Sequence, residues 1–136
     1  MTYALDTNTI VHYLRKEPNV LKNFDNAAIQ GDTFFIPKLV DYEIRRGFSI
    51  VSAPRKEDTY NVLTEQCVIA PISDMVWEYA IQIYSSLYKK GFSVGELDIL
   101  IAAVSITNDC TLVTSNTKDF VNMDGLALVD WKIAVK

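Results

Sequence analysis

The sequence has few of the features that mark membrane, secreted or disordered proteins. Its longest unbroken apolar run, Ile99–Val104, falls far short of the ~20 apolar residues that a membrane-spanning helix needs. Five glycines and four prolines are too few for a collagen-like or linker-like chain. The segment Met1–Asp6 holds no basic residue before its first acid, so we expect no secretory signal peptide and a cytoplasmic protein. The two cysteines, Cys67 and Cys110, are then expected to be reduced, small buried side chains.

The sequence also has fewer basic than acidic residues. Thirteen Lys and Arg residues face seventeen Asp and Glu residues, which gives a net charge of −4. This balance argues against nucleic-acid binding over a broad basic face, but not against a local site where metal ions carry the positive charge. The single histidine, His12, makes a zinc site or His-based acid–base catalysis improbable. Neither GxxxxGK[ST] nor GxGxxG occurs, and no serine or cysteine nucleophile has an evident partner.

The length and composition of the chain are those of one globular domain. The chain has 136 residues, of which 49% are hydrophobic and 22% charged. This length is close to the commonest domain size and is enough to bury a core without disulfides or metal. No internal repeat or composition break divides it. We therefore expect a single domain over residues 1–136.

Short apolar strands are expected to alternate with helices. The predicted strands cover residues 2–5, 33–36, 67–70, 111–114 and 126–129. Capping residues and apolar spacing predict the helices. They cover residues 7–14, 18–31, 56–66, 73–91, 96–107 and 118–121, and one more helix begins at residue 39. Strands that are apolar throughout and separated by helices predict a parallel sheet covered on both faces. The expected fold is a three-layer α/β/α domain with a central parallel sheet of four to five strands.

Four acidic residues stand where such a sheet binds ligands, beyond the carboxyl ends of its strands. Asp6 directly follows the first strand, and Asp119 comes shortly after the fourth. Glu43 borders an apolar helical stripe, and Asp98 precedes the apolar run Ile99–Val104. Taken singly, each acid also has a structural interpretation as a helix cap or turn residue.

Acids that converge on one crevice would repel one another and raise each other's pKa. Hard divalent cations such as Mg²⁺ and Mn²⁺ relieve that repulsion, and carboxylate oxygens are the ligands they prefer. Two ions about 4 Å apart are the recurring device for in-line hydrolysis of phosphodiesters. The acids, taken together, therefore point to metal-dependent phosphodiester chemistry.

Five segments of the sequence together carry a family resemblance. They are Leu5–Ile10 (LDTNTI), Tyr42–Gly47 (YEIRRG), Asp98–Ala103 (DILIAA), Thr114–Phe120 (TSNTKDF) and the closing Asp130-Trp131. With these segments in this order and spacing, the chain resembles the PIN-domain nucleases. It is most similar to the VapC type of small ribonuclease toxin from bacterial toxin–antitoxin pairs. The resemblance covers essentially the whole chain.

The resemblance implies a PIN-like fold and a Mg²⁺- or Mn²⁺-dependent endoribonuclease. The positions that match the family's acidic metal-binding and catalytic residues are Asp6, Glu43, Asp98 and Asp119. Thr7 and Asn116 match polar positions that orient this cluster. Two positions depart from the family: Ser115 stands where many relatives carry a basic residue, and Glu96 where they often carry Asn. Glu96 is either a fifth ligand, a helix-capping acid or a solvated side chain.

The resemblance also implies partners. These are an RNA substrate such as tRNA or rRNA, and a cognate VapB-like antitoxin whose C-terminal tail occupies the cleft. Assembly as a homodimer or as a toxin–antitoxin hetero-oligomer is implied as well, and no membrane is involved. The basic residues considered for RNA contact are Lys38, Arg45, Arg46, Lys89, Lys90 and Lys118. Arg45 and Arg46, just past Glu43, are hypothesised to flank the cleft and hold RNA near the metals.

Three other functions stay open. One is a phosphatase or phosphotransferase that uses Asp6 as a covalent nucleophile, although Asn8 replaces the second acid of the DxDxT-like motif that such enzymes carry. Another is a catalytically inactive PIN-like module that only binds RNA or metal. The last is a housekeeping RNA-processing nuclease that has no antitoxin.

Overall fold

The computed structural model describes residues 1–134, and strands and helices follow one another in the order predicted from the sequence. Within these residues the strands are β1 (Thr2–Leu5), β2 (Thr33–Pro37), β3 (Cys67–Ala70), β4 (Thr111–Val113) and β5 (Ala127–Val129). The helices are α1 (Thr7–Leu14), α2 (Pro18–Ile29), α3 (Lys38–Ile50), α4 (Pro54–Glu65), α5 (Asp74–Lys90), α6 (Glu96–Thr107) and α7 (Thr117–Phe120).

The strands form one parallel sheet in the order β3-β2-β1-β4-β5. β1 is central, and its Ala4 pairs with Phe35 of β2 on one side and with Leu112 of β4 on the other. The chain builds outward from β1 through β2 to β3 and then returns to place β4 on the opposite side of β1. Beyond the carboxyl ends of β1 and β4, such a change of direction opens the crevice in which α/β sheets bind ligands.

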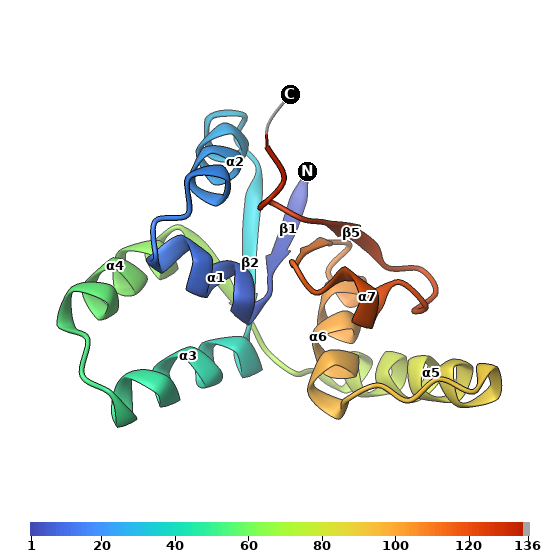
Figure 1. Cartoon of the computed structure of the whole chain (residues 1–136). Coiled ribbons are helices and arrows are strands. Elements are labelled where there is room, and N and C mark those ends of the chain that lie inside the picture. Colours follow the sequence, from blue (N-terminus) through green and yellow to red (C-terminus); the bar gives the residue numbers. More distant parts are fainter. Residues whose placement is uncertain (135–136) are drawn as a thin grey trace.

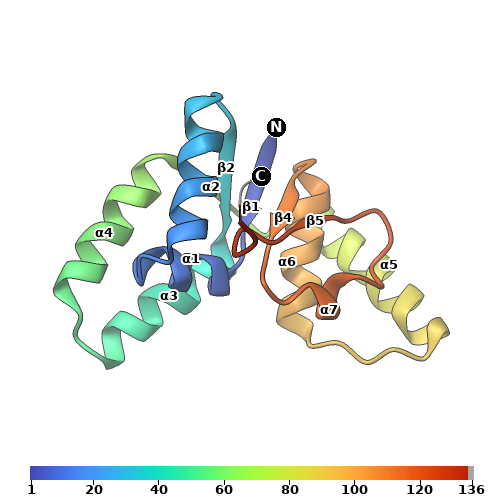
Figure 2. The ribbon, with the colours of Figure 1, turned by 45° about the horizontal axis from the view of Figure 1, so that its top comes forward.

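Helices cover both faces of the sheet. Figures 1 and 2 show α1, α2, α3 and α4 on one side of the strands and α5, α6 and α7 on the other. Buried apolar residues of the strands, such as Ala4, Ile36 and Leu112, fill the space between these layers. The three-layer α/β/α architecture and the parallel sheet are thus confirmed. No helix within residues 1–134 is long and apolar enough to cross a membrane.

Local signals fix both ends of α5 and the start of α4. The Ser73 hydroxyl accepts a hydrogen bond from the Val76 backbone N–H at the start of α5, and Gly91 ends α5 at a φ of 81°, which favours glycine. The start predicted for α4 at Lys56 is wrong by two positions. The helix begins at Pro54, because proline has a helical φ and its missing N–H is not needed in the first turn.

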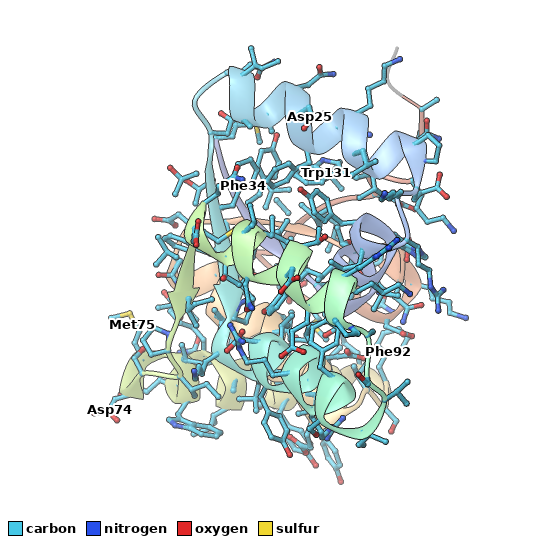
Figure 3. The ribbon with its side chains drawn as sticks, turned by 90° about the vertical axis from the view of Figure 1, so that its left-hand side faces the viewer. Asp25, Phe34, Asp74, Met75, Phe92 and Trp131 are labelled. Atoms are coloured by element: carbon cyan, nitrogen blue, oxygen red, sulfur yellow. The ribbon has the colours of Figure 1, made fainter. Side chains whose placement is uncertain are left out.

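An aromatic cluster closes the fold at the end of the described chain. Trp131 packs edge-on against Tyr3 of β1 at a ring distance of 5.1 Å, and Phe24 of α2 stacks on Phe34 of β2 at 4.5 Å. Figure 3 shows Phe34 and Trp131 beneath α2. The Asn23 side-chain amide donates to the Trp131 carbonyl oxygen at 3.0 Å. These contacts attach the final segment to β1 and α2.

A buried acid that no local sequence pattern singles out joins α3 to α4. Asp41 is only 4% exposed, and its carboxylate accepts hydrogen bonds from the Tyr60 hydroxyl at 2.7 Å and from Arg45 Nε at 2.9 Å. Lys38 Nζ lies 3.5 Å from the same carboxylate. Burial and the neighbouring Asp41 raise the pKa of the Tyr60 hydroxyl far above its usual range. Tyr60 therefore stays protonated as a hydrogen-bond donor.

Replacing Asp41 with alanine is expected to lower the free energy of unfolding by about 2 kcal/mol, because the buried Tyr60 hydroxyl loses its acceptor and two cations lose their counter-charge. Urea unfolding followed by circular dichroism measures this. Asp58→Ala, at an exposed acid of α4, is the control and should change stability little. Equal losses for the two variants would show that Asp41 does not join these helices.

Candidate functional site

Asp6 is held in place at the point where β1 passes into α1. Its carboxylate caps α1 by accepting from the Thr7 backbone N–H at 2.7 Å. The other carboxylate oxygen accepts from the Thr114 hydroxyl at 2.8 Å and from the Asn8 amide at 3.2 Å. The side chain is 5% exposed. Two donors from the start of α1 and one from the loop after β4 therefore fix the orientation of this acid.

Asn8 connects the start of α1 to the loop after β4. Its amide donates to the Thr114 hydroxyl at 3.2 Å, and its carbonyl oxygen accepts from the Ser115 backbone N–H at 3.1 Å. The Thr114 hydroxyl in turn accepts from the Asn116 backbone N–H at 3.0 Å. This network sets the position of the loop that carries Asn116 and leads into α7.

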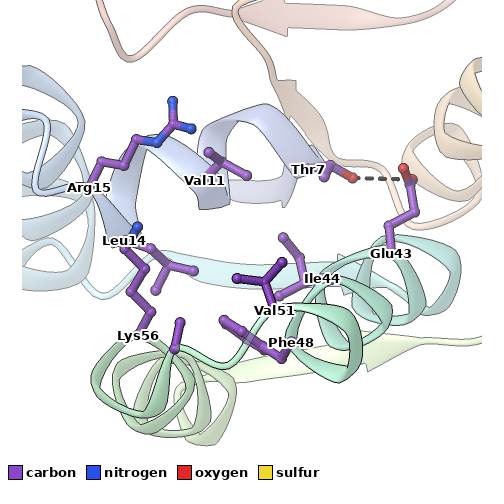
Figure 4. A pocket seen from close by; sticks show the side chains of 11 residues that line it. Thr7, Val11, Leu14, Arg15, Glu43, Ile44, Phe48, Val51 and Lys56 are labelled. Carbon is purple, nitrogen blue, oxygen red and sulfur yellow. Dashed lines mark hydrogen bonds between the residues drawn. The ribbon is translucent and has the colours of Figure 1, made fainter.

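Glu43 and Asp98 reach the same region from helices on opposite sides of the sheet. The Thr7 hydroxyl donates to Glu43 Oε1 at 3.2 Å, which joins α1 to α3 (Figure 4). Asp98 lies in the first turn of α6, where the helix dipole favours an acid. The buried Ile99 and Ile101 that follow it anchor this end of α6 in the core.

These side chains line one hollow, which we call the acidic cleft, with a volume of about 480 Å³. Its lining comes from α1, α3, α6 and the loop after β4, and consists of Asp6, Thr7, Asn8, Val11, His12, Arg15, Glu43, Leu97, Asp98, Ile101 and Asn116. Of the residues predicted to form or orient the site, the structure thus brings Asp6, Thr7, Glu43, Asp98 and Asn116 to a single cavity.

The acids of the acidic cleft carry negative charge that no ion pair among the described residues neutralises. Burial, and then the carboxylates of Asp6, Asp119 and Glu43, raise the pKa of Asp98 to about 6. Burial and Glu43 also raise the pKa of Asp6, although the hydrogen bonds that its carboxylate accepts lower it in part. Within residues 1–134, none of these four acids forms an ion pair with a basic group. A cation from outside the chain would relieve this repulsion.

Asp119 lies beside the acidic cleft rather than in its lining. It belongs to α7, and its charge reaches Asp98 strongly enough to help raise the pKa of that acid. Across the described residues, no three Asp, Glu, His or Cys side chains are grouped tightly enough to hold one ion between them. Mg²⁺ is commonly bound by only one or two carboxylates, with water and substrate phosphate as its other ligands. An all-carboxylate donor set spread around a cleft fits that mode of binding.

Glu96 lies away from the acidic cleft. Although it is two residues from Asp98 on α6, it lines a separate hollow with Trp77, Ile81 and Tyr84 of α5. Residues two apart on a helix point in nearly opposite directions, about 200° around its axis. As placed, Glu96 is an exposed side chain and does not join the other acids.

The basic residues proposed for RNA contact are not among those that line the acidic cleft. Arg45 and Lys38 bind Asp41, and Arg46 lies over the Tyr42 ring at 5.1 Å. Lys90 pairs with Asp124 at 3.0 Å. Lys89 and Lys118 are exposed on α5 and α7.

Two residues that were not predicted for the site, Arg15 and His12, do line the acidic cleft. His12 Nε2 lies 3.5 Å from the Ser115 hydroxyl, and burial and the nearby Lys132 lower the pKa of this histidine. A signal for Arg15 was present in the sequence. Thr7, Val11 and Arg15 are spaced four residues apart, so they lie along one face of α1 and of the residue that follows it.

Comparison with known proteins agrees with this geometry. The family model described as "PIN domain" matches residues 3–126. Ribonuclease VapC2 of Rickettsia felis is 30% identical over 134 residues, covering 96% of this chain and 98% of the relative. Ribonuclease VapC1 of Haemophilus influenzae is 25% identical over 133 residues, with the same coverage of both chains.

A solved structure of a VapC relative has a similar fold. The crystal structure of VapBC2 from Rickettsia felis bound to a DNA fragment from their promoter contains a similar chain, with a TM-score of 0.87 and 28% identity. The match covers 96% of this chain and 99% of that chain. The family model matches most of the chain, and these relatives align with nearly all of it. This chain therefore belongs to the PIN-domain family and, within it, to the VapC family.

Proposed function

We propose that this chain is a VapC-type toxin, an endoribonuclease that cuts RNA phosphodiester bonds at the acidic cleft with the help of Mg²⁺ or Mn²⁺. The observation that carries the proposal is the convergence of Asp6, Glu43 and Asp98, with Asp119 nearby, at the switch point of a parallel sheet. Within residues 1–134 these acids form no ion pair. The names of the relatives, ribonuclease VapC, support the same activity. We propose that residues 1–136 act as one domain.

The roles of the residues follow from their contacts. Asp6, Glu43, Asp98 and Asp119 would hold the ions, which when bound would neutralise the acids and polarise the scissile phosphate. Thr7 orients Glu43 through its hydroxyl, while Thr114 and Asn8 fix the Asp6 carboxylate. Asn116 supplies a polar group at the rim, where a strand of RNA would enter.

We further propose a cognate VapB-like antitoxin as the partner of this chain, as the VapBC structure of Rickettsia felis supports. A flexible antitoxin tail carrying a basic residue would match the negative charge of the acidic cleft. We also propose a homodimer or a toxin–antitoxin hetero-oligomer in the cytoplasm, where an RNA substrate is found.

Incubation of total cellular RNA with the purified, antitoxin-free protein tests the function. We expect discrete fragments in Mn²⁺ or Mg²⁺ and none in EDTA, because the carboxylates need the ions to approach a phosphate. Cleavage that persists in EDTA would contradict the proposed mechanism. Binding of RNA without cleavage under any metal would instead favour the inactive RNA-binding module.

A further inference from the structure

A second hollow opens next to the acidic cleft. This hollow, which we call the side groove, has a volume of about 380 Å³ and lies between α1, α3 and the start of α4 (Figure 4). Thr7, Val11, Arg15 and Glu43 line both hollows. The two hollows therefore adjoin each other along these shared residues, and the side groove is the next surface that a chain-like ligand bound at the acids would meet.

The side groove has charge of opposite sign at its two ends. Figure 4 shows Glu43 and Thr7 at one end and the side chains of Arg15 and Lys56 at the other. The surface between them is apolar and is formed by Val11, Leu14, Ile44, Phe48 and Val51.

Arg15 and Lys56 are free to contact a ligand. Among the described residues, neither side chain forms an ion pair or a hydrogen bond, and both are exposed. Arg45 and Lys38, by contrast, are bound to Asp41. In a chain with a net charge of −4, two cations at the end of a groove that begins at the acidic cleft form a local positive site.

We propose that the side groove is a subsite for the RNA strand, in which Arg15 and Lys56 bind backbone phosphates of nucleotides next to the scissile bond. This inference rests on the proposed function and names the path that the substrate takes. Arginine and lysine neutralise phosphates without reading the sequence, and they position the strand. The apolar surface, with the Phe48 ring, suits the face of a base, since bases stack on aromatic side chains.

RNA fits this arrangement because its phosphates repeat along the strand. One phosphate would lie at the acids, where metal ions compensate its charge. A neighbouring phosphate would then lie at Arg15 and Lys56. If the side groove instead takes only a protein segment, removal of the two cations would leave the binding of RNA unaffected.

The test compares two double variants of equal charge. Arg15→Ala/Lys56→Ala removes the proposed phosphate contacts. Lys22→Ala/Arg55→Ala removes two exposed cations of α2 and α4 that line neither hollow. Each is made in an Asp98→Asn background, so that the strand stays intact. Binding of a fluorescein-labelled, mixed-sequence single-stranded RNA is measured by anisotropy in Mn²⁺ over a range of salt concentrations.

We expect Arg15→Ala/Lys56→Ala to raise the Kd for RNA about tenfold or more. The slope of log affinity against log salt concentration should fall by about 0.7 for each phosphate that the variant no longer neutralises. The control should change both quantities much less. Equal effects of the two double variants, or no binding of RNA by the parent protein, would overturn the subsite. Binding that depends on Arg15 and Lys56, together with no cleavage of RNA in Mn²⁺ or Mg²⁺ by the protein with Asp98 intact, would support the subsite and reject the proposed nuclease.

Discussion

Replacing Asp98 with asparagine is expected to reduce metal-dependent RNA cleavage by about 10³-fold, equivalent to about 4 kcal/mol of lost transition-state stabilisation. Asparagine keeps the size of the side chain but removes the negative charge that would hold an ion opposite Asp6 and Glu43. The measurement is the initial rate of RNA cleavage in Mn²⁺. Asp74→Asn is the matched control, because Asp74 is also an acid in the first turn of a helix but lies outside the acidic cleft. A variant at Asp98 as active as the control would remove this acid from the site.

The same variant is expected to stabilise the metal-free protein by about 1 kcal/mol, after allowance for screening by solvent. The pKa of Asp98 is about 6 in the folded state, above its ordinary value of 3.8, so the folded state binds more protons between these pH values. Asp98 therefore destabilises the wild-type fold increasingly as the pH rises from about 4 to about 6.

The difference in free energy of unfolding between Asp98→Asn and wild type should follow that pH range. It should be near zero below pH 4, grow towards pH 6 and stay constant above. Urea unfolding in EDTA at several pH values measures it. A difference that does not change with pH would mean that burial and the acidic neighbours do not raise the pKa of Asp98 in the folded state.

Addition of metal is expected to have the second largest effect. An ion that binds only the folded chain stabilises it by about 2.7 kcal/mol at a concentration of 100 times its Kd. Thermal unfolding with increasing Mn²⁺ should therefore show a rising Tm, which EDTA reverses. Because protons compete for Asp98, whose pKa is about 6, the rise should be smaller at pH 5 than at pH 7.5.

The Asp98→Asn variant provides the control for this titration. It should start from a higher Tm without metal and gain less from Mn²⁺ than wild type. Asp74→Asn should behave as wild type does. The same gain in all three proteins would place the ion elsewhere, and no gain in wild type would contradict metal binding at the acidic cleft.

The order of the elements could be predicted from the sequence because each carries its own signals. Ser73 and Gly91 mark the ends of α5, and the short apolar strands require cover on both faces. The acids could be predicted as a group because parallel strands bring their carboxyl ends to one edge of the sheet. Their role as metal ligands stays a prediction.

The basic residues that line the acidic cleft could not be predicted from their distance in sequence to an acidic residue. Arg45 is two residues from Glu43, but on a helix this places it on the other side, where it binds Asp41. The burial of Asp41 depends on Tyr60, nineteen positions further along the chain, and no local pattern signals that contact. Arg15 was predictable in principle, from its helical spacing with Thr7 and Val11.

Analysis of the cleaved RNA ends in ¹⁸O-labelled water tests the central claim most directly. The claim is that the acidic cleft directs water, rather than the ribose 2′-hydroxyl, against the scissile phosphate. We predict linear phosphate ends that carry one ¹⁸O atom from the solvent, formed by wild type in Mn²⁺ and absent with Asp6→Asn. Ends with a 2′,3′-cyclic phosphate, formed equally well in EDTA or by Asp6→Asn, would contradict it.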